Sequence, residues 1–375
     1  MKNSKVKNIL FKMEIKGVGV VNYDGTEQKW TINQTSLNHM KTRHKNTSYA
    51  KKRFYGTPED TKYKLIISSD CLRHDIFKGD VPFHSPNVNS DDTLLTLAIA
   101  SIGHIIRGYM YPTKSLITYK RKGPLSITSA VQTNDTISHI ECFTSSAKKN
   151  TDKDKEGADP TLFFKEVVGE MVYESKGFID LMNLQFVSCD QIFDRSGFNP
   201  DLFNVYKQFL QSKIPSFNSE LGYYQIKDSV IGIGEYGFKF SNDVINILVR
   251  ELFKRMISMN IQRKDAFAET TSLKYKLVYD VIEDTLSSED GWITVENEKD
   301  IENISFEVED FYILSDTEKE NKLRLVIEEE YERTKKIKKD ERMGFEELKK
   351  EKDSLKQKKV KKEMVEQAKN FTTNE

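Results

Sequence analysis

Basic and aromatic residues alternate in a polar stretch near the N-terminus, a combination that suits nucleic acid. The cations are Lys41, Arg43, His44, Lys45, Lys51, Lys52 and Arg53, and Tyr49, Phe54 and Tyr55 lie among them. Lysine and arginine neutralise phosphates, and aromatic rings offer faces on which unpaired bases stack. A basic loop that only faces water has the same composition, so that alternative stays open.

Two serines stand at the start of a short helix that we expect after an apolar strand. Residues 63–67 form the strand, Ser68 or Ser69 is the expected N-cap, and Arg73 and His74 follow within the helix. Backbone amides at a helix start attract phosphate, which makes Ser68, Ser69, Arg73 and His74 candidate phosphate contacts. The alternative is a serine that only caps the helix.

Two further groups of basic residues support the same chemistry. Lys120, Arg121 and Lys122 end a predicted strand, and Lys148 and Lys149 belong to the polar stretch 144–161. That stretch has too few apolar side chains to bury, so we expect an exposed and mobile loop.

Other kinds of site find little support. The run from Gly232 to Gly237 has the glycine spacing of a dinucleotide site, but its glutamate and the lack of a matching strand after the next helix favour a tight turn. The six histidines lack metal-binding spacing, and no signature of a nucleophile is present. Asp91 and Asp92 suit the start of a helix. The sequence predicts no catalytic residue, no metal and no cofactor.

The elements that must position these residues alternate irregularly between strand and helix. Hydrophobic periodicity predicts the following. Strands are expected within 6–21, at 63–67, 116–120, 137–143, 163–173, 178–188 and 223–233, and helices at 70–77, 91–106, 200–211 and 241–260. Residues 33–62 form a polar excursion outside the core, and 317–370 a lysine- and glutamate-rich helix. This pattern indicates an α+β fold with large polar insertions, not a doubly wound sheet.

Charge is unevenly distributed along the 375 residues, although Lys+Arg and Asp+Glu both total 58. Residues 1–125 hold 21 basic and 10 acidic side chains, whereas 280–316 hold 13 acidic side chains and one lysine. A polyanion site near the N-terminus fits this asymmetry. The chain lacks an apolar run long enough to span a bilayer, and its three distant cysteines suit a reducing compartment, so we expect a cytoplasmic protein.

The segment Ile67-Ser68-Ser69-Asp70-Cys71-Leu72-Arg73-His74 resembles the strand–Ser-Ser–helix signature of the backbone subunits of Class 1 CRISPR effector complexes, in the repeat-associated (RAMP) superfamily. The later order is similar as well: residues 120–128, a strand, a polar loop, and then Leu162-Phe-Phe-Lys-Glu-Val167. The resemblance covers residues 6–260 and looks closest to type I, with a variant of subtype F as the nearest style. The charged tail departs from the family pattern.

The resemblance implies a modified RRM-like (ferredoxin-like) palm over residues 1–315, followed by a charged helical tail at 316–375. The palm would carry the basic excursion 33–62, finger helices at 69–110 and a β-hairpin thumb with its loop at 144–161. The implied function is sequence-independent binding of guide RNA by several copies of a subunit that is not an enzyme. Partners would be guide RNA, target nucleic acid paired to that guide, further copies of the chain and other complex subunits, with no membrane.

Two other classes of function remain open. A repeat-processing RNA endonuclease of the same superfamily would need a general acid–base histidine, and His39 or His44 could serve. Asp24 and Asp70 are the nearest candidates for the cleaving aspartate of related type III subunits, but neither lies in a recognisable cleavage motif. A structural or interaction protein with solvated basic loops is the second alternative.

Overall fold

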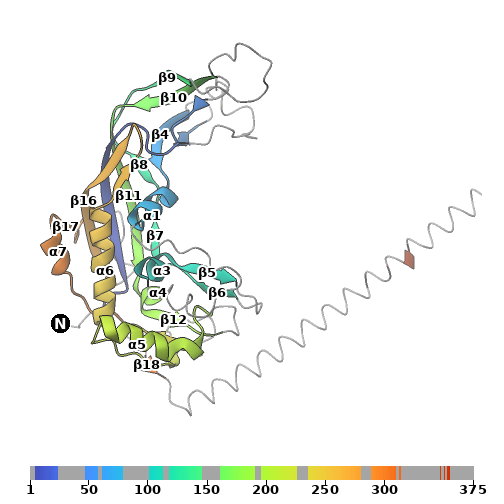
Figure 1. The fold of residues 1–375 in the computed structure, drawn as a ribbon, viewed down its shortest axis with the longest axis vertical. Helices are drawn as coiled ribbons and strands as arrows, with labels where there is room; N and C mark the ends of the chain where they lie inside the picture. The colour runs from blue at the N-terminus through green and yellow to red at the C-terminus, as the bar shows by residue number, and fades with distance from the viewer. Residues whose placement is uncertain are drawn as a thin grey trace, which may run out of the picture. The chain divides into compact units, whose positions relative to one another are not determined.

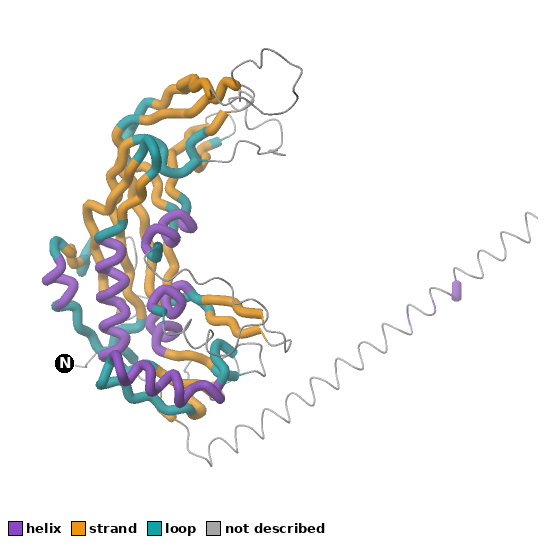
Figure 2. The backbone as a smooth tube through the Cα atoms, in the orientation of Figure 1, coloured by secondary structure: helices purple, strands orange, loops and turns teal. Residues whose placement is uncertain are grey.

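The computed structural model describes residues 5–23, 47–57, 61–78, 101–112, 118–145, 161–190, 196–225, 235–279, 289–309 and 312–313, with helical positions at 347, 350 and 353–354. Antiparallel strands make up the main sheet, and helices pack against it (Figures 1 and 2). The predicted α+β combination is therefore confirmed.

The centre of the main sheet is β1 (Asn8–Val18), which pairs antiparallel with β11 (Glu170–Asp180) and β16 (Phe267–Val278). The alternation predicted for this segment is confirmed, because Ile9, Phe11, Met13 and Ile15 are all 0% exposed while the residues between them face outward. The register places Ile9 opposite both Ile179 and Leu277.

Shorter strands extend the main sheet on both sides. On one side lie β7 (Leu125–Ile127) and β8 (Ala130–Gln132), then β4 (Thr61–Ile67), and at the edge β3 (Lys52–Gly56). On the other side β15 (Asn260–Gln262) and β17 (Ile293–Val295) both pair with β16. The polar excursion was expected to lie outside the core, but its described part supplies β3, and Ala50 is buried. That expectation was wrong for these residues.

The longest described helix, α6 (Asn242–Ile257), follows Ser241 as predicted and packs on β16. It also contacts α1 (Ser69–Ile76) and α4 (Leu181–Gln185). Helix α3 (Ile102–Arg107) covers the end of the helix expected at 91–106, but it begins only after Ser101, whose backbone is extended, so the expectation of one continuous helix was wrong at this residue; residues 91–100 lie outside the described part. Helix α7 (Glu298–Glu302) begins with a capping box at Asn297 and contacts α6.

Three smaller groups of strands accompany the main sheet. A hairpin joins β5 (Tyr109–Pro112) and β6 (Thr118–Arg121). A second joins β9 (Ser138–Ser145) and β10 (Thr161–Val168), and β2 (Thr47–Ser48) pairs with β10. β12 (Phe186–Ser188) pairs with β14 (Glu235–Lys239). The β9–β10 hairpin confirms that the loop predicted as the thumb tip connects two paired strands, although residues 146–160 lie outside the described part.

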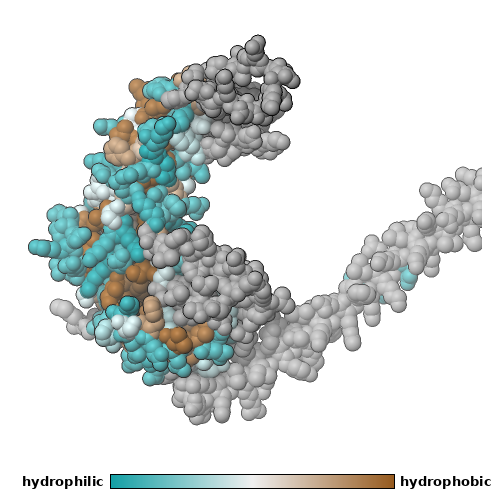
Figure 3. Space-filling view, viewed as in Figure 1, coloured by the Kyte–Doolittle hydropathy of each residue, from teal (hydrophilic) through white to brown (hydrophobic). Residues whose placement is uncertain are grey.

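An aromatic cluster fills the core beside β14. The expected helix at 200–211 is present as the 3-10 turn η2 (Pro200–Leu202) and α5 (Phe203–Lys213). Tyr206 is fully buried and its ring lies 5.3 Å from Phe198 and 5.6 Å from Phe238. The opposite side of α5 is exposed and shows apolar surface within a mostly hydrophilic view (Figure 3).

Three predictions about local structure were wrong. The strand expected at 163–173 is two strands that separate at Gly169, and the one expected at 178–188 is interrupted by α4. Helix α4 forms because Asp180 is its N-cap and accepts a hydrogen bond from the Asn183 amide at 3.0 Å. Gly237 lies within β14 and not in a strand-to-helix turn, and glycine is needed there because a Cβ would meet Val187 O of the paired strand at 2.2 Å.

A second, smaller compact unit comprises 223–235 and 312–375. Within it, β13 (Gly222–Gln225) pairs antiparallel with β18 (Tyr312–Ile313), with Tyr224 opposite Ile313. The helix predicted for 317–370 is described only at the four positions given above and otherwise lies outside the described residues. Among the described helices none is long and apolar enough to span a bilayer.

Candidate nucleic-acid interface

The predicted basic residues near position 50 lie on a β-hairpin that leads directly into α1. Strands β3 and β4 pair antiparallel, with Lys52 opposite Leu65, Arg53 opposite Lys64 and Tyr55 opposite Lys62. Because side chains alternate along a strand, Lys52 and Arg53 point to opposite faces of this hairpin. The sheet therefore divides the predicted cluster into two sets with different surroundings.

The inner face of the hairpin, the one that carries Lys52, is held against the β9–β10 hairpin by a buried carboxylate. Glu166 in β10 is 3% exposed and accepts Lys52 Nζ at 2.6 Å and the Ala50 amide at 3.0 Å. Lys52 Nζ also lies 4.4 Å from the centre of the Tyr63 ring. The charge of Lys52 is thus neutralised inside the protein, and this lysine connects β3 to β10.

Beside this pair, Tyr23 connects the end of the β1 region to the same strand. Its hydroxyl donates to Glu166 O at 3.3 Å, and the Lys165 ammonium lies 5.5 Å from its ring. Burial, with the nearby carboxylates of Asp265 and Glu166, raises the pKa of the Tyr23 hydroxyl to about 12. Lys165 in turn pairs with Asp265 at 2.7 Å, so β10 is fixed from both of its faces.

The start of α1 is closed mainly by the protein's own groups. Ser68 is the N-cap, and its Oγ accepts the Cys71 amide at 3.4 Å. The Ser69 amide donates to Ser129 Oγ at 3.3 Å, and the Ser68 amide to Asn22 Oδ1 at 3.4 Å. These contacts favour the capping role of the serines over phosphate capture, because the amides that would bind phosphate already have acceptors.

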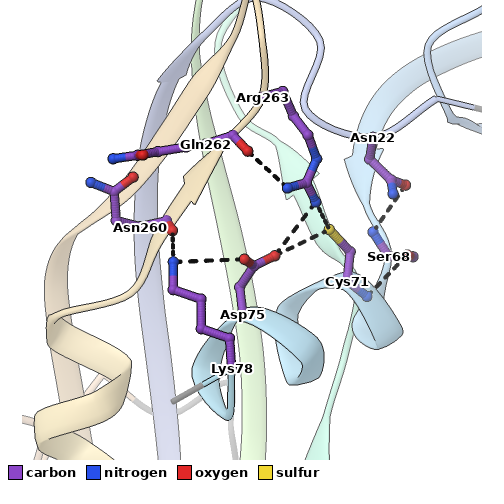
Figure 4. A network of polar contacts seen from close by, with 8 residues as sticks. All are labelled: Asn22, Ser68, Cys71, Asp75, Lys78, Asn260, Gln262 and Arg263. Atoms are coloured by element: carbon purple, nitrogen blue, oxygen red, sulfur yellow. Dashed lines mark hydrogen bonds and ion pairs between the residues drawn. The ribbon is translucent and has the colours of Figure 1, made fainter. Parts of the chain in front are cut away.

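Helix α1 is anchored through the buried carboxylate of Asp75 (Figure 4). The Asp75 side chain is 4% exposed and lies 3.6 Å from Arg263 Nη2 and 3.9 Å from Lys78 Nζ. Lys78 Nζ also donates to Asn260 O in β15. Arg73 is half-buried and His74 exposed, and neither forms an ion pair with a described residue. The predicted basic pair is thus presented by a helix whose orientation is fixed.

Cys71 completes this network without becoming reactive. Its sulfur lies 3.8 Å from Asp75 Oδ2 and 3.7 Å from Arg263 Nη2. Burial raises the pKa of the Cys71 thiol, and the Asp75 carboxylate raises it further. The thiol therefore stays protonated and takes a structural part in the anchor.

Arg121 does not face solvent, unlike the lysine that follows it. The residue is 9% exposed, and its guanidinium donates to carbonyls in the last turns of two helices. The acceptors are Ile105 O of α3 at 3.3 Å, Asn183 O and Leu184 O of α4 at 2.5 and 3.2 Å, and Phe186 O at 2.5 Å. A cation is favourable at helix C-termini, where carbonyls lack partners. We therefore leave Arg121 out of the proposed RNA contacts.

Some of the remaining predicted residues are exposed or half-buried in the structure, and the others lie outside the described residues. Lys122 is exposed, while Lys120 is half-buried in β6 and its amide donates to Ser196 O at 2.9 Å. Lys51 is half-buried and Arg53 exposed. Lys41, Arg43, Lys45, Lys148 and Lys149 lie outside the described residues, as do His39 and His44.

A family model matches residues 5–280 and carries the description "Type I-Fv CRISPR-associated protein Cas7fv-like". That span is most of the chain. The chain belongs to the Cas7fv-like family. The predicted resemblance to type I CRISPR proteins, with a subtype F variant as the nearest style, is confirmed at the level of family.

Solved structures that resemble this Cas7fv-like protein are distant in sequence. One chain of a "CRISPR RNA-guided surveillance complex" is 10% identical, with 71% of this chain and 68% of that chain covered and a TM-score of 0.30. A chain of a "CRISPR RNA-guided surveillance complex, pre-nicking" is 9% identical, with 72% and 77% covered and a TM-score of 0.34. A comparison with curated proteins found no match.

Sequence reasoning missed three residues that matter for this interface. The first is Glu166, which forms the buried ion pair with Lys52. Its position as an acidic residue within the apolar stretch of β10 is the sequence feature that could have indicated this pair. Lys62 and Lys64 lie beyond the cluster named from the sequence, yet the pairing of β3 with β4 brings them opposite Tyr55 and Arg53. The register of the hairpin therefore places the basic residues of β3 and those of β4 on one surface.

Proposed function

We propose that this Cas7fv-like protein is a non-catalytic backbone subunit that binds guide RNA without sequence preference, with several copies along one RNA. The observation that carries the proposal is a set of cations on the β3–β4 hairpin, on α1 and directly after β6. Arg53, Lys64, Arg73 and Lys122 form no ion pair with a described residue, in contrast to Lys52. Cations without partners are suited to phosphates, which carry no sequence information.

The strand order supports an RRM-like palm. In chain order, β1, α1, β7–β8, β11, α6 and β16 follow a β-α-β-β-α-β pattern, and the sheet runs β16-β1-β11 and then β7 or β8. A ferredoxin-like fold has the same order, with its first and third strands at the centre of the sheet, and this agreement supports the proposed palm. The β3–β4 hairpin and the β9–β10 hairpin would then be insertions into this palm, the latter serving as the thumb.

The open face of the sheet argues against base stacking in the usual RRM manner. Where an RRM presents aromatic side chains, β1 carries Lys12, Glu14 and Lys16 on this face. Lys12 Nζ lies 4.3 Å from the centre of the Trp292 ring and 3.7 Å from Glu289. The neighbouring Lys176 pairs with Glu174 at 2.9 Å. Lys12 and Lys176 on this face thus have acidic partners within the protein, and we expect RNA at the hairpins and α1.

Partners and location follow from this proposal. Target nucleic acid would be recognised by pairing with the guide, and other complex subunits and further copies would complete the assembly in the cytoplasm. No group of three or more potential metal-ligating side chains occurs among the described residues. A repeat-processing endonuclease is the competing proposal, and cleavage of repeat RNA by the purified protein would favour it.

Salt-dependent RNA binding tests the proposal. In the Arg73→Ala/Lys122→Ala variant we expect weaker binding of every single-stranded RNA sequence, and a salt slope reduced by about 0.7 for each lost phosphate contact. The matched control, Lys207→Ala/Lys213→Ala on α5, removes the same charge and should bind as the wild type does. Fluorescence anisotropy across a salt titration measures both. Equal affinities and slopes for the two variants would contradict the proposed surface.

A further inference from the structure

The outer face of the β3–β4 hairpin, the one opposite Lys52, places like charges directly across from each other. Arg53 on β3 is opposite Lys64 on β4, and Tyr55 is opposite Lys62 one pair further along. Residues directly opposite in an antiparallel pair have Cβ atoms about 4.5–5.5 Å apart, and like charges at that distance destabilise the pairing. The free protein therefore carries a local electrostatic cost at this face.

Nothing described in the protein offsets this cost for the Arg53–Lys64 pair. Neither side chain forms an ion pair or hydrogen bond with a described residue, although Lys64 is half-buried. The inner face differs, because its lysine meets a buried glutamate at 2.6 Å. The hairpin thus has one face whose lysine is neutralised and another face with two cations that have no ion-pair partner among the described residues. An external anion would supply the missing neutralisation.

An aromatic ring stands beside the opposed cations. Tyr55 lies two residues from Arg53 on the same face of β3 and is 45% exposed. Two residues along a strand span about 6.8 Å, so a ligand with an anion at Arg53 can place a flat group on Tyr55. Phosphate and base alternate at comparable spacing along a single nucleic-acid strand, and exposed tyrosine stacks on unpaired bases.

We propose that this outer face is a binding site for single-stranded nucleic acid, with Arg53 and Lys64 sharing one phosphate and Tyr55 stacking on an adjacent base. The inference rests on the proposed function and names the residues that carry it out. Guide RNA and the complementary target strand offer the same chemistry, and the experiment below separates them. Because the phosphate removes a repulsion that is present in the free protein, binding should also stabilise the hairpin.

The Lys64→Glu variant tests the site through two effects of opposite sign. It replaces the repulsion with an Arg53–Glu pair, so the melting temperature of the free protein should rise by about 1–2 °C. It also places a negative charge where the phosphate binds, so affinity for single-stranded RNA should fall by about tenfold or more. Lys64→Gln should also raise the melting temperature and lower the RNA affinity, but by smaller amounts than Lys64→Glu. Arg53→Gln should have the same effects as Lys64→Gln.

Further arms of the experiment identify the base contact and the strand. Tyr55→Phe should bind as the wild type does, and Tyr55→Ala should bind more weakly. A loss seen with guide RNA alone assigns the site to the guide. A loss seen only when a complementary strand is added to protein already loaded with guide assigns it to the target strand.

Several results would overturn the inference. If Lys64→Glu and Arg53→Gln bind both strands like the wild type, the hairpin site is wrong while the proposed function stands. If these variants lose melting temperature and affinity together, the pair has a structural role only. If the wild type itself fails to bind RNA in a salt-dependent way, both the inference and the proposed function fail.

Discussion

Replacing Arg121 with methionine is expected to lower the free energy of unfolding by roughly 3 kcal/mol or more, the largest effect of any change at the predicted basic residues. The guanidinium satisfies four backbone carbonyl oxygens, of which those of Ile105, Asn183 and Leu184 belong to helix ends. Methionine fills a similar volume but donates no hydrogen bond, so each carbonyl stays desolvated without a partner.

Urea denaturation of the Arg121→Met variant measures this effect, and Lys122→Met is its matched control. The control lies one residue away but is exposed, so its unfolding free energy should remain within about 0.5 kcal/mol of the wild type. Arg121→Lys should fall between the two, because an ammonium has fewer donors and lacks the planar fork. An Arg121→Met protein as stable as Lys122→Met would contradict the anchoring role assigned to this side chain.

Loss of the buried carboxylate at Glu166 should have an effect of similar size. In Glu166→Ala, Lys52 and the Ala50 amide both lose their acceptor, and we expect destabilisation of about 3 kcal/mol. Glu166→Gln keeps an acceptor oxygen for the amide and removes the charge, so it should cost less, about 1–2 kcal/mol.

A double-mutant cycle separates the ion pair from the other contacts of Glu166. The single variants Lys52→Met and Glu166→Gln, with their double variant, should give a coupling free energy of about 1–3 kcal/mol. Arg53→Met on the opposite face of the same strand serves as the control partner and should show no coupling with Glu166→Gln. Equal coupling for Lys52 and Arg53 would contradict the two-faced hairpin.

Elements that bury one regular face could be predicted from the sequence. The alternation of Ile9, Phe11, Met13 and Ile15 follows from a strand that is buried on one side, and α6 shows the corresponding helical spacing. Ser68 was one of two candidate caps, and the structure selects it. The family itself was reached through the Ser-Ser segment and the order of the later motifs, and it is confirmed.

Contacts between distant segments could not be predicted, because they depend on tertiary register and not on local pattern. In the sequence Arg121 looks like its basic neighbours. It is buried because the C-terminal ends of α3 and α4 both lie against it and their carbonyls accept its hydrogen bonds. The Lys52–Glu166 pair joins residues 114 positions apart. Strand propensity also continued through 178–188, where the Asp180 cap starts a helix that local hydrophobicity does not reveal.

Assembly on RNA of increasing length is the most direct test of the central claim that copies of this protein bind guide RNA without regard to sequence. The mass of the complex, measured by mass photometry on two unrelated RNA sequences in several lengths, should rise in steps of one subunit with RNA length and be the same for both sequences. A single bound copy at every length, assembly on only one of the sequences, or no complex at all would contradict the account.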